Sequence, residues 1–272
     1  MIELLAPALV ACLLLASILC YFGLHVLMRE VIFVDIALAQ LAALGATVGH
    51  VASGHTHSAT TYFYSFGFTL AGAAIFAFLD LKRRRVPQEA VIGIVYGVSA
   101  ALVLLVLSKT ALDRDEVESI LTGRLLFADW GEIGLMAILF GAVALLHVGM
   151  RRRFLEISAR SRTLSSKNPR QKLLDFVFYA SFGVVVTSSV QLAGVLVVFG
   201  LLIVPASCAA IFFATIGLRL LAGWLIGSAG SGVGIAASAL WDLPTGAAVV
   251  AALGAAFALA VLGAAFLRDS NS

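Results

Sequence analysis

Stretches of about 20 mostly apolar residues follow one another along almost the whole of this chain, and no polar domain separates them. A helix needs about this length to cross the hydrocarbon core of a bilayer, where every backbone polar group must be satisfied within the segment. Nine stretches meet the criterion: Leu4–Leu27, Val31–Val51, Tyr62–Leu81, Val91–Leu107, Ile133–Met150, Leu173–Val190, Leu192–Phe213, Leu218–Leu240 and Thr245–Leu267. The sequence therefore predicts an all-α integral membrane bundle of about nine spans, within a range of eight to ten, forming one domain over residues 1–272.

Composition agrees with this prediction and excludes a soluble enzyme. Of the 272 residues, 61% are hydrophobic and 12% are charged, with a mean hydropathy of +1.06. A soluble domain carries about 25% charged residues. The three cysteines lie in apolar stretches, which favours small buried side chains over disulfides or a metal cage: Cys12, Cys20 and Cys208. The first residues contain an acid and no basic group, so they indicate a first span and not a cleaved signal peptide.

The distribution of basic residues predicts an orientation, because Lys and Arg concentrate in the cytoplasmic loops of membrane proteins. With the N-terminus outside, 15 of the 18 basic residues fall in the cytoplasm: Arg29, Lys82–Arg85, eight in Arg151–Lys172, Arg219 and Arg268. The other three lie outside: Lys109, Arg114 and Arg124. The sequence therefore predicts an N-out, C-in topology, with 151–172 as the longest cytoplasmic loop.

Glycines cluster in the second-last predicted span, at Gly223, Gly227, Gly230, Gly232 and Gly234. Small residues at such spacing let helices approach closely in a membrane. We expect these positions to mark helix contacts.

Three stretches in order resemble the permease family of ABC importers for zinc, manganese and iron, the ZnuB-type metal permeases. Val26–Gly49 resembles the family's second span, Gln191–Phe212 its glycine- and proline-containing signature span, and Ser238–Gly246 (SALWDLPTG) the turn before its last helix. Weaker similarities lie at Val86–Gly97 and Ile120–Gly134.

The resemblance implies a type II ABC importer permease fold in a bacterial cytoplasmic (inner) membrane. It implies a homodimer around a central pathway, two cytoplasmic ATP-binding cassette subunits and an extracytoplasmic metal-binding protein. The cargo would be a divalent metal ion, with no tightly bound cofactor. The chain contains no Gly-Lys pair and hence no P-loop, so ATP would be hydrolysed by the partner subunit and not by this chain.

Asp35 and Gln40 are candidate pathway residues, because an acid within a membrane helix is costly and commonly functional. The two side chains lie five residues apart, about 140° around a helix, so they do not share a face. In the related permeases an aspartate and a histidine lie four residues apart, and these positions are Ile36 and Gln40 here. The alternative is a structural Asp35 that pairs with Arg29 or Arg219.

Two further features have both a functional and a structural interpretation. Pro205 removes a helix hydrogen bond, which either frees a carbonyl in the pathway or makes a kink relieved by neighbouring helices. His50, His55 and His57 form a candidate metal-sampling loop, since imidazole suits zinc and other late divalent metals. The alternative for the histidines is a solvated loop.

The segment 151–172 carries a candidate ATPase-coupling element, which we call the docking segment: Phe154, Leu155, Glu156, Ile157 and Ser158. The resemblance implies a short cytoplasmic helix here that docks on the ATPase; a basic loop that only fixes topology is the alternative. For the whole chain, the competing functions are an ion-coupled secondary transporter or exporter that uses Asp35 as a relay, and an ABC permease for a metal chelate.

Overall fold

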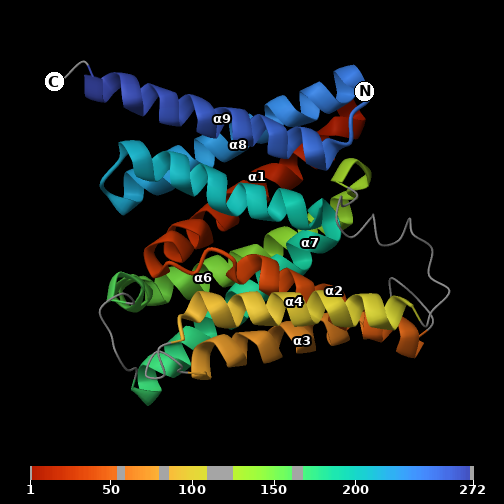
Figure 1. The fold of residues 1–272 in the computed structure, drawn as a ribbon. Coiled ribbons are helices and arrows are strands. Elements are labelled where there is room, and N and C mark those ends of the chain that lie inside the picture. Colours follow the sequence, from red (N-terminus) through yellow and green to blue (C-terminus); the bar gives the residue numbers. More distant parts are fainter. Residues whose placement is uncertain (1, 54–58, 80–85, 109–124, 161–167, 270–272) are drawn as a thin grey trace. The chain divides into compact units, whose positions relative to one another are not determined.

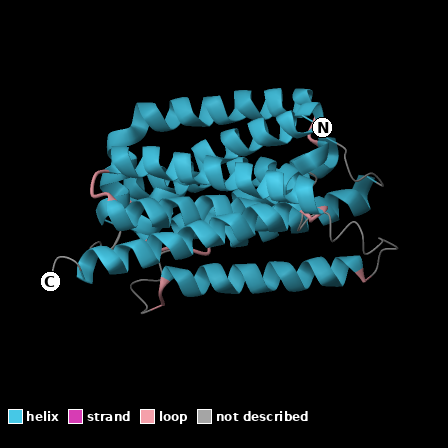
Figure 2. Ribbon diagram, turned by 90° about the horizontal axis from the view of Figure 1, so that it is seen from above, coloured by secondary structure: helices cyan, strands magenta, loops and turns pink. Residues whose placement is uncertain are grey.

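The structure is a computed structural model, and it describes residues 2–53, 59–79, 86–108, 125–160 and 168–269. The regular structure of this part of the chain is helical throughout (Figures 1 and 2). Its elements are α1 (Ile2–Arg29), α2 (Val34–Ser53), α3 (Ala59–Phe78), α4 (Gln88–Leu107), the short 3-10 helix η2 (Leu125–Phe127), α6 (Trp130–Arg160), α7 (Pro169–Phe212), α8 (Ile216–Trp241) and α9 (Thr245–Asp269). Eight of these helices are long and apolar enough to span a bilayer. The predicted all-helical membrane bundle is confirmed, with a count inside the expected range.

Helix α7 accounts for the difference between eight helices and nine predicted spans. Its 44 residues include both Leu173–Val190 and nearly all of Leu192–Phe213. A straight helix of that length would extend about 66 Å, roughly twice the hydrocarbon thickness of a bilayer. The helical path is broken at Gly194, whose φ of 78° and ψ of 161° are open to glycine and strained for other residues. The element therefore consists of two helical stretches joined at that residue.

The segment 151–172 is helical at both ends. Helix α6 continues ten residues past the predicted span end at Met150, because Arg151–Arg160 contains neither glycine nor proline. Before α7, the Asn168 Oδ1 accepts the Gln171 N–H at 2.9 Å, and the Gln171 Oε1 accepts the Asn168 N–H at 3.0 Å. Reciprocal bonds of this kind, followed by proline at the first helical position, begin a helix. Residues 161–167 lie outside the described part.

The chain folds into two compact units. Unit 1 comprises Met1–Leu27, Leu121–Ala144 and Ser189–Ser272; unit 2 comprises Met28–Ile120 and Leu145–Ser188. The divisions fall within α1, α6 and α7, so each of these helices contributes residues to both units.

Unit 2 is built on close packing of α2 against α3 and α4, which run side by side (Figure 1). A Cβ atom on Gly45 of α2 would lie 2.5 Å from the Tyr64 carbonyl oxygen of α3, so only glycine permits this approach. The Ser65 hydroxyl donates to the Ala42 carbonyl oxygen at 2.8 Å across the same contact. A backbone approach of this kind is typical of membrane helices joined by small residues.

Unit 1 contains the glycine-rich helix α8, which packs against α9. Cβ atoms built on four of its clustered glycines would meet neighbouring helices: Gly223, Gly227, Gly230 and Gly234. A Cβ on Gly232 would meet nothing within 4 Å. The predicted packing role is thus confirmed at four positions, and Gly232 is the exception.

The motif Ser238–Gly246 forms the turn between α8 and α9. Asp242 ends α8 in the left-handed conformation, with φ of 50° and ψ of 45°. The Ser238 hydroxyl donates to the Leu243 carbonyl oxygen at 2.7 Å and lies 2.8 Å from the Thr245 hydroxyl. These contacts satisfy polar groups at the helix ends, which would otherwise be costly in an apolar environment.

Candidate coupling site

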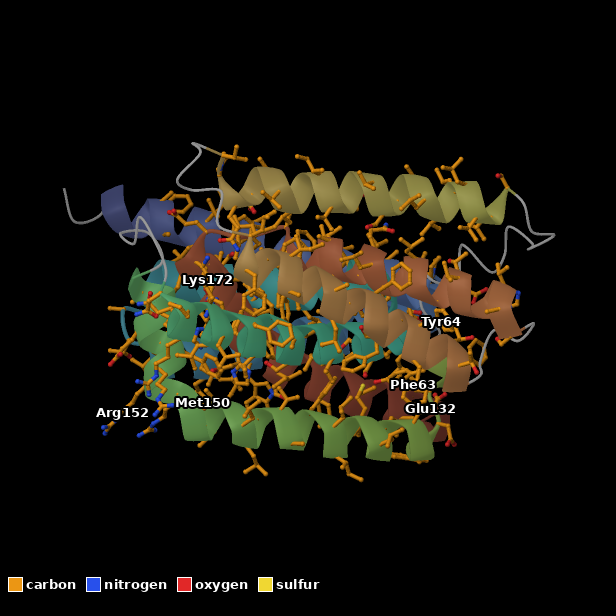
Figure 3. All side chains as sticks on the ribbon, turned by 90° about the horizontal axis from the view of Figure 1, so that it is seen from below. Phe63, Tyr64, Glu132, Met150, Arg152 and Lys172 are labelled. Carbon is orange, nitrogen blue, oxygen red and sulfur yellow. The ribbon has the colours of Figure 1, made fainter. Side chains whose placement is uncertain are left out.

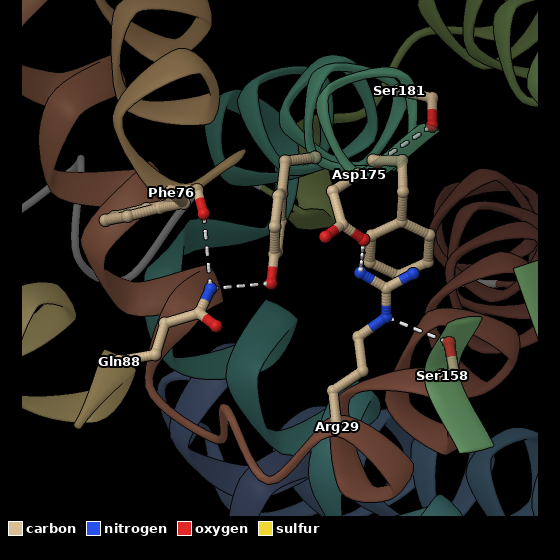
Figure 4. Close-up of polar contacts among 8 residues, drawn as sticks. Arg29, Phe76, Gln88, Ser158, Asp175 and Ser181 are labelled. Carbon is tan, nitrogen blue, oxygen red and sulfur yellow. Dashed lines mark hydrogen bonds and ion pairs between the residues drawn. The ribbon is translucent and has the colours of Figure 1, made fainter. Parts of the chain in front are cut away.

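A buried ion pair in unit 2 joins the end of α1 to the beginning of α7. The Arg29 Nη1 donates to the Asp175 Oδ1 at 2.8 Å, and the side chains are 2% and 0% exposed. The Arg29 Nε donates to the Ser158 hydroxyl of α6 at 2.9 Å (Figure 4). A single guanidinium therefore holds three helices together, and Ser158 belongs to the docking segment.

Aromatic rings surround this guanidinium. The Arg29 Cζ lies 3.8 Å from the ring centroid of Phe178 and 5.5 Å from that of Tyr179. Phe154 packs on Phe178 with centroids 5.9 Å apart, and stacks on His147 at 4.5 Å. Cation–π contacts are strongest where the cation is desolvated, so the rings help to stabilise a buried charge.

Two further polar side chains, Gln88 and His147, make hydrogen bonds beside the same aromatic group. The Gln88 Nε2 of α4 donates to the Tyr179 hydroxyl at 3.0 Å and to the Phe76 carbonyl oxygen of α3 at 3.3 Å (Figure 4). The His147 Nε2 of α6 lies 2.7 Å from the Ser181 hydroxyl of α7. The Arg29 cluster is thereby connected to α3 and α4 as well as to α6 and α7.

The docking segment has two faces in the last turns of α6. Phe154, Ile157 and Ser158 are buried, whereas Glu156 is exposed and Leu155 is partly exposed. The exposed face also contains Arg151–Arg153 and Ala159, and the Arg152 side chain points away from the helix (Figure 3). We call the residues Arg151, Arg152, Arg153, Glu156 and Ala159 the docking face.

The alternative that pairs Asp35 with Arg29 is wrong, because Arg29 pairs with Asp175. The pairing of Asp35 with Arg219 stays a prediction, since the two residues belong to different units; the Arg219 Nε donates to the Phe213 carbonyl oxygen at 2.7 Å. Asp35 lies in the first turn of α2, where the helix dipole favours an acid, and is 2% exposed. Its Oδ1 has no hydrogen-bond partner among the described residues.

The other predicted pathway residues occupy different settings. Gln40 lies on α2, one turn beyond Ile36, and both side chains are partly exposed. Pro205 is buried in unit 1: Cβ atoms on Gly223 and Gly227 of α8 would lie 3.2 Å from its carbonyl oxygen and its Cγ. Helix α8 thus packs closely on the proline at these two glycines.

Only one of the three candidate metal-sampling histidines can be placed. His50 lies in the last turn of α2 and is partly exposed, whereas His55 and His57 lie outside the described residues. In the described part of the chain, no three His, Cys, Asp or Glu side chains come together as a metal-binding group.

Sequence reasoning missed Asp175 and Glu89. Asp175 is an acid inside the predicted span Leu173–Val190, so the rule that selected Asp35 also selects it. Glu89 lies in the first turn of α4, and its Oε1 accepts the Ile32 N–H at 2.8 Å, which fixes the link between α1 and α2. The pairing of Arg29 with Asp175 could not be found from the sequence, since the two residues are 146 positions apart in the chain.

These features define a class: a multi-pass helical membrane protein, with a buried charged junction behind an exposed basic helix end. The model of the ABC 3 transport family matches residues 1–264. The chain therefore belongs to the ABC 3 transport family, and it is a permease, the transmembrane subunit of an ABC transporter without an ATPase domain.

One relative by sequence and two solved structures are similar to this chain. A Synechocystis sp. protein described as an uncharacterized membrane protein is 23% identical over 248 residues, covering 91% of this chain and 86% of that one. The structure of PsaBC from Streptococcus pneumoniae in complex with Fab contains a similar chain, with a TM-score of 0.75, 17% identity and coverage of 94% and 90%. A transporter provisionally assigned to the metal-chelate type of ABC transporters, in an inward-facing conformation, gives a TM-score of 0.68, 20% identity and coverage of 95% and 85%.

Proposed function

We propose that this chain is the permease through which an ABC importer moves a divalent metal ion, zinc, manganese or iron, into the cytoplasm. The observation that carries the proposal is family membership over residues 1–264. A homodimer of the chain would form the pathway, two separate ATPase subunits would supply the energy, and an extracytoplasmic metal-binding protein would deliver the ion. Cargo binding in the pathway would be weak, because the delivering protein supplies the affinity.

The proposed topology has nine crossings, with the N-terminus outside and the C-terminus inside. It treats α7 as two spans separated at Gly194, each long enough to cross a bilayer on its own. Orientation by the positive-inside rule then places Arg29, the docking face and the beginning of α7 at the cytoplasmic surface of the inner membrane.

The docking face is the proposed contact with the ATPase. Three arginines and one glutamate on the last turns of a helix form an exposed polar surface, which is unsuited to the hydrocarbon core. The buried side of the same turns, Phe154, Ile157 and Ser158, anchors it in the bundle. Glu156→Arg combined with Ala159→Trp should reduce co-purification of the ATPase, while Leu145→Ala on the exposed apolar side of α6 should not. Equal ATPase recovery with all variants would contradict this contact.

A metal chelate is the second candidate cargo, and Gln40 favours it. The related metal permeases have a histidine at this position, whereas an amide is a poor ligand for zinc. The similar fold of a transporter provisionally assigned to the metal-chelate type points in the same direction.

Elemental analysis of cells with and without this chain tests the cargo. Under starvation for one metal at a time, deletion of the chain should lower the cellular content of the transported metal. Supplying that metal either as a chelate or as the free ion then shows which of these two forms is the cargo. Equal contents of zinc, manganese and iron under all conditions would overturn the importer proposal.

A secondary transporter that uses Asp35 as a relay makes the opposite prediction in vesicles. The importer should take up metal only with ATP and an ATPase subunit, whatever the proton gradient. Flux that follows a proton gradient without ATPase, and that Asp35→Asn abolishes, would replace the proposal with the secondary transporter.

A further inference from the structure

We infer that Arg29 is a positioning residue for energy coupling: it links the docking segment to the beginning of α7, so that movement of one is transmitted to the other. The inference rests on the proposed function, because it takes the end of α6 as the place where the ATPase acts. Beyond the proposed function, the inference names the hydrogen bonds of Arg29 as the connection from the end of α6 to α7.

The geometry of the guanidinium supports a link between elements. Its Nε–H is bonded to Ser158 on the buried side of the docking segment, and its Nη1–H to Asp175 on the second turn of α7. Arg29 itself is the last residue of α1. In chain order, α7 leads on to Gln191–Phe212, the stretch with the glycine break and Pro205. A displacement of the last turns of α6 therefore has a hydrogen-bonded route to the second turn of α7.

Stability alone does not explain a charge pair at this position. A buried ion pair loses the hydration of both ions, and its replacement by apolar side chains is often neutral or stabilising. The pair also falls short of the strongest geometry, since a bidentate guanidinium–carboxylate contact would use two nitrogens of the fork. Here the Arg29 Nη2 has no hydrogen-bond partner among the described residues.

The aromatic contacts stabilise the guanidinium without fixing its orientation. Phe178 faces the cation at 3.8 Å and Tyr179 lies at 5.5 Å, and a ring face attracts a cation without requiring one fixed hydrogen-bond angle. The side chain is thus restrained by directional bonds to α6 and α7 and by non-directional contacts elsewhere. Such a residue can pass on a displacement between helices that each remain packed.

The test uses the full permease reconstituted in vesicles with the ATPase subunit that co-purifies with it. The variants are Arg29→Met, Arg29→Lys and Ser158→Ala, with Ser65→Ala as the matched control. Ser65 is also a buried serine whose hydroxyl joins two helices, because it donates to the Ala42 carbonyl oxygen of α2 at 2.8 Å, and its partner is not one of the residues around Arg29. The readouts are the amount of assembled complex and the ratio of ion taken up to ATP hydrolysed, with Zn²⁺, Mn²⁺ or Fe²⁺ supplied alone.

We expect Arg29→Met and Ser158→Ala to lower uptake per ATP by about threefold or more in assembled complexes. Arg29→Lys should restore part of the loss, since it retains the charge opposite Asp175, and Ser65→Ala should match the wild type. Unchanged uptake per ATP in Arg29→Met, or an equal loss in Ser65→Ala, would overturn the inference.

If Arg29→Met fails to assemble, the double variant Arg29→Met with Asp175→Leu removes both buried charges together and should fold. Normal coupling in that double variant would also overturn the inference. The wild-type complex tests the proposed function separately from the role of Arg29. If the wild type takes up an ion with ATP and the variants have no effect, only the role of Arg29 is removed. No ATP-dependent uptake of any of the three ions by the wild type would remove the proposed function and this inference with it.

Discussion

Gly45 of α2 meets Ser65 of α3 at backbone distance: a Cβ atom on the glycine would lie 2.6 Å from the serine Cα. Gly45 also lies in the stretch that resembles the second span of the related permeases. The structure explains the glycine by the space available at the contact. An added methyl group has no flexible side chain to displace here, because the neighbouring atoms are backbone.

We therefore expect Gly45→Ala to destabilise unit 2 by about 1–3 kcal/mol, the usual cost of overpacking a close contact. Heat-induced loss of monodisperse protein in detergent would measure the change. Gly67→Ala is the matched control on α3, because a Cβ at that position meets nothing within 4 Å. Equal midpoints for the two variants would contradict the packing described for α2 and α3.

A second prediction concerns α8 and α9. A Cβ on Gly234 would lie 2.7 Å from the Val249 backbone nitrogen, whereas one on Gly232, two residues earlier, meets nothing within 4 Å. Gly234→Ala should lower the unfolding midpoint, and Gly232→Ala should leave it unchanged or raise it slightly, since alanine favours helix over glycine. The opposite order would indicate a different rotation of α8 about its axis.

Substitutions of Phe154 and Glu156, which lie on the same turn of α6, should have different effects on folding. Phe154 is 0% exposed and packs on Phe178 and His147, so Phe154→Ala should cost about 3–5 kcal/mol and reduce the yield of folded permease. Glu156→Ala should leave the yield unchanged, because its side chain is exposed. Detergent-solubilised yield on size exclusion provides the comparison, and a loss of fold with Glu156→Ala would contradict the assigned faces.

A further prediction concerns the rate of metal uptake and the three histidines of the candidate metal-sampling loop. If His50, His55 and His57 sample metal before entry, replacing all three by alanine should slow uptake at limiting metal and leave uptake at saturating metal unchanged. A solvated loop without such a role gives the same rates as the wild type at both concentrations. Uptake measured against external metal concentration distinguishes the two outcomes.

Much of the architecture could be read from the sequence because the bilayer imposes it. Spans are long apolar runs, and the structure places helices at all nine predicted stretches, usually with ends within a few residues. The larger differences arose where the chain itself gives no stop signal. Arg151–Arg160 continues α6 because charged helix formers end a hydrophobic run without ending a helix.

The pairing of the buried charges was decided only by tertiary structure. Arg29 and Asp35 are six positions apart in the chain, which favoured a local ion pair. In the structure Glu89 accepts the Ile32 N–H in the turn after α1, and Arg29 pairs with Asp175. An ionisable residue in a span can be recognised from sequence, since its burial is costly wherever it lies. Its partner depends on which helix faces it.

The sequence by itself thus determined that the chain is a membrane bundle, where its spans lie and which family its ordered motifs resemble, because these follow from local hydrophobicity and spacing. Only the tertiary structure decided that Ser158 and Phe154 face inward while Glu156 faces out, and that one guanidinium joins α1, α6 and α7. Those relationships depend on the rotation and contact of helices far apart in the chain, which no local pattern specifies.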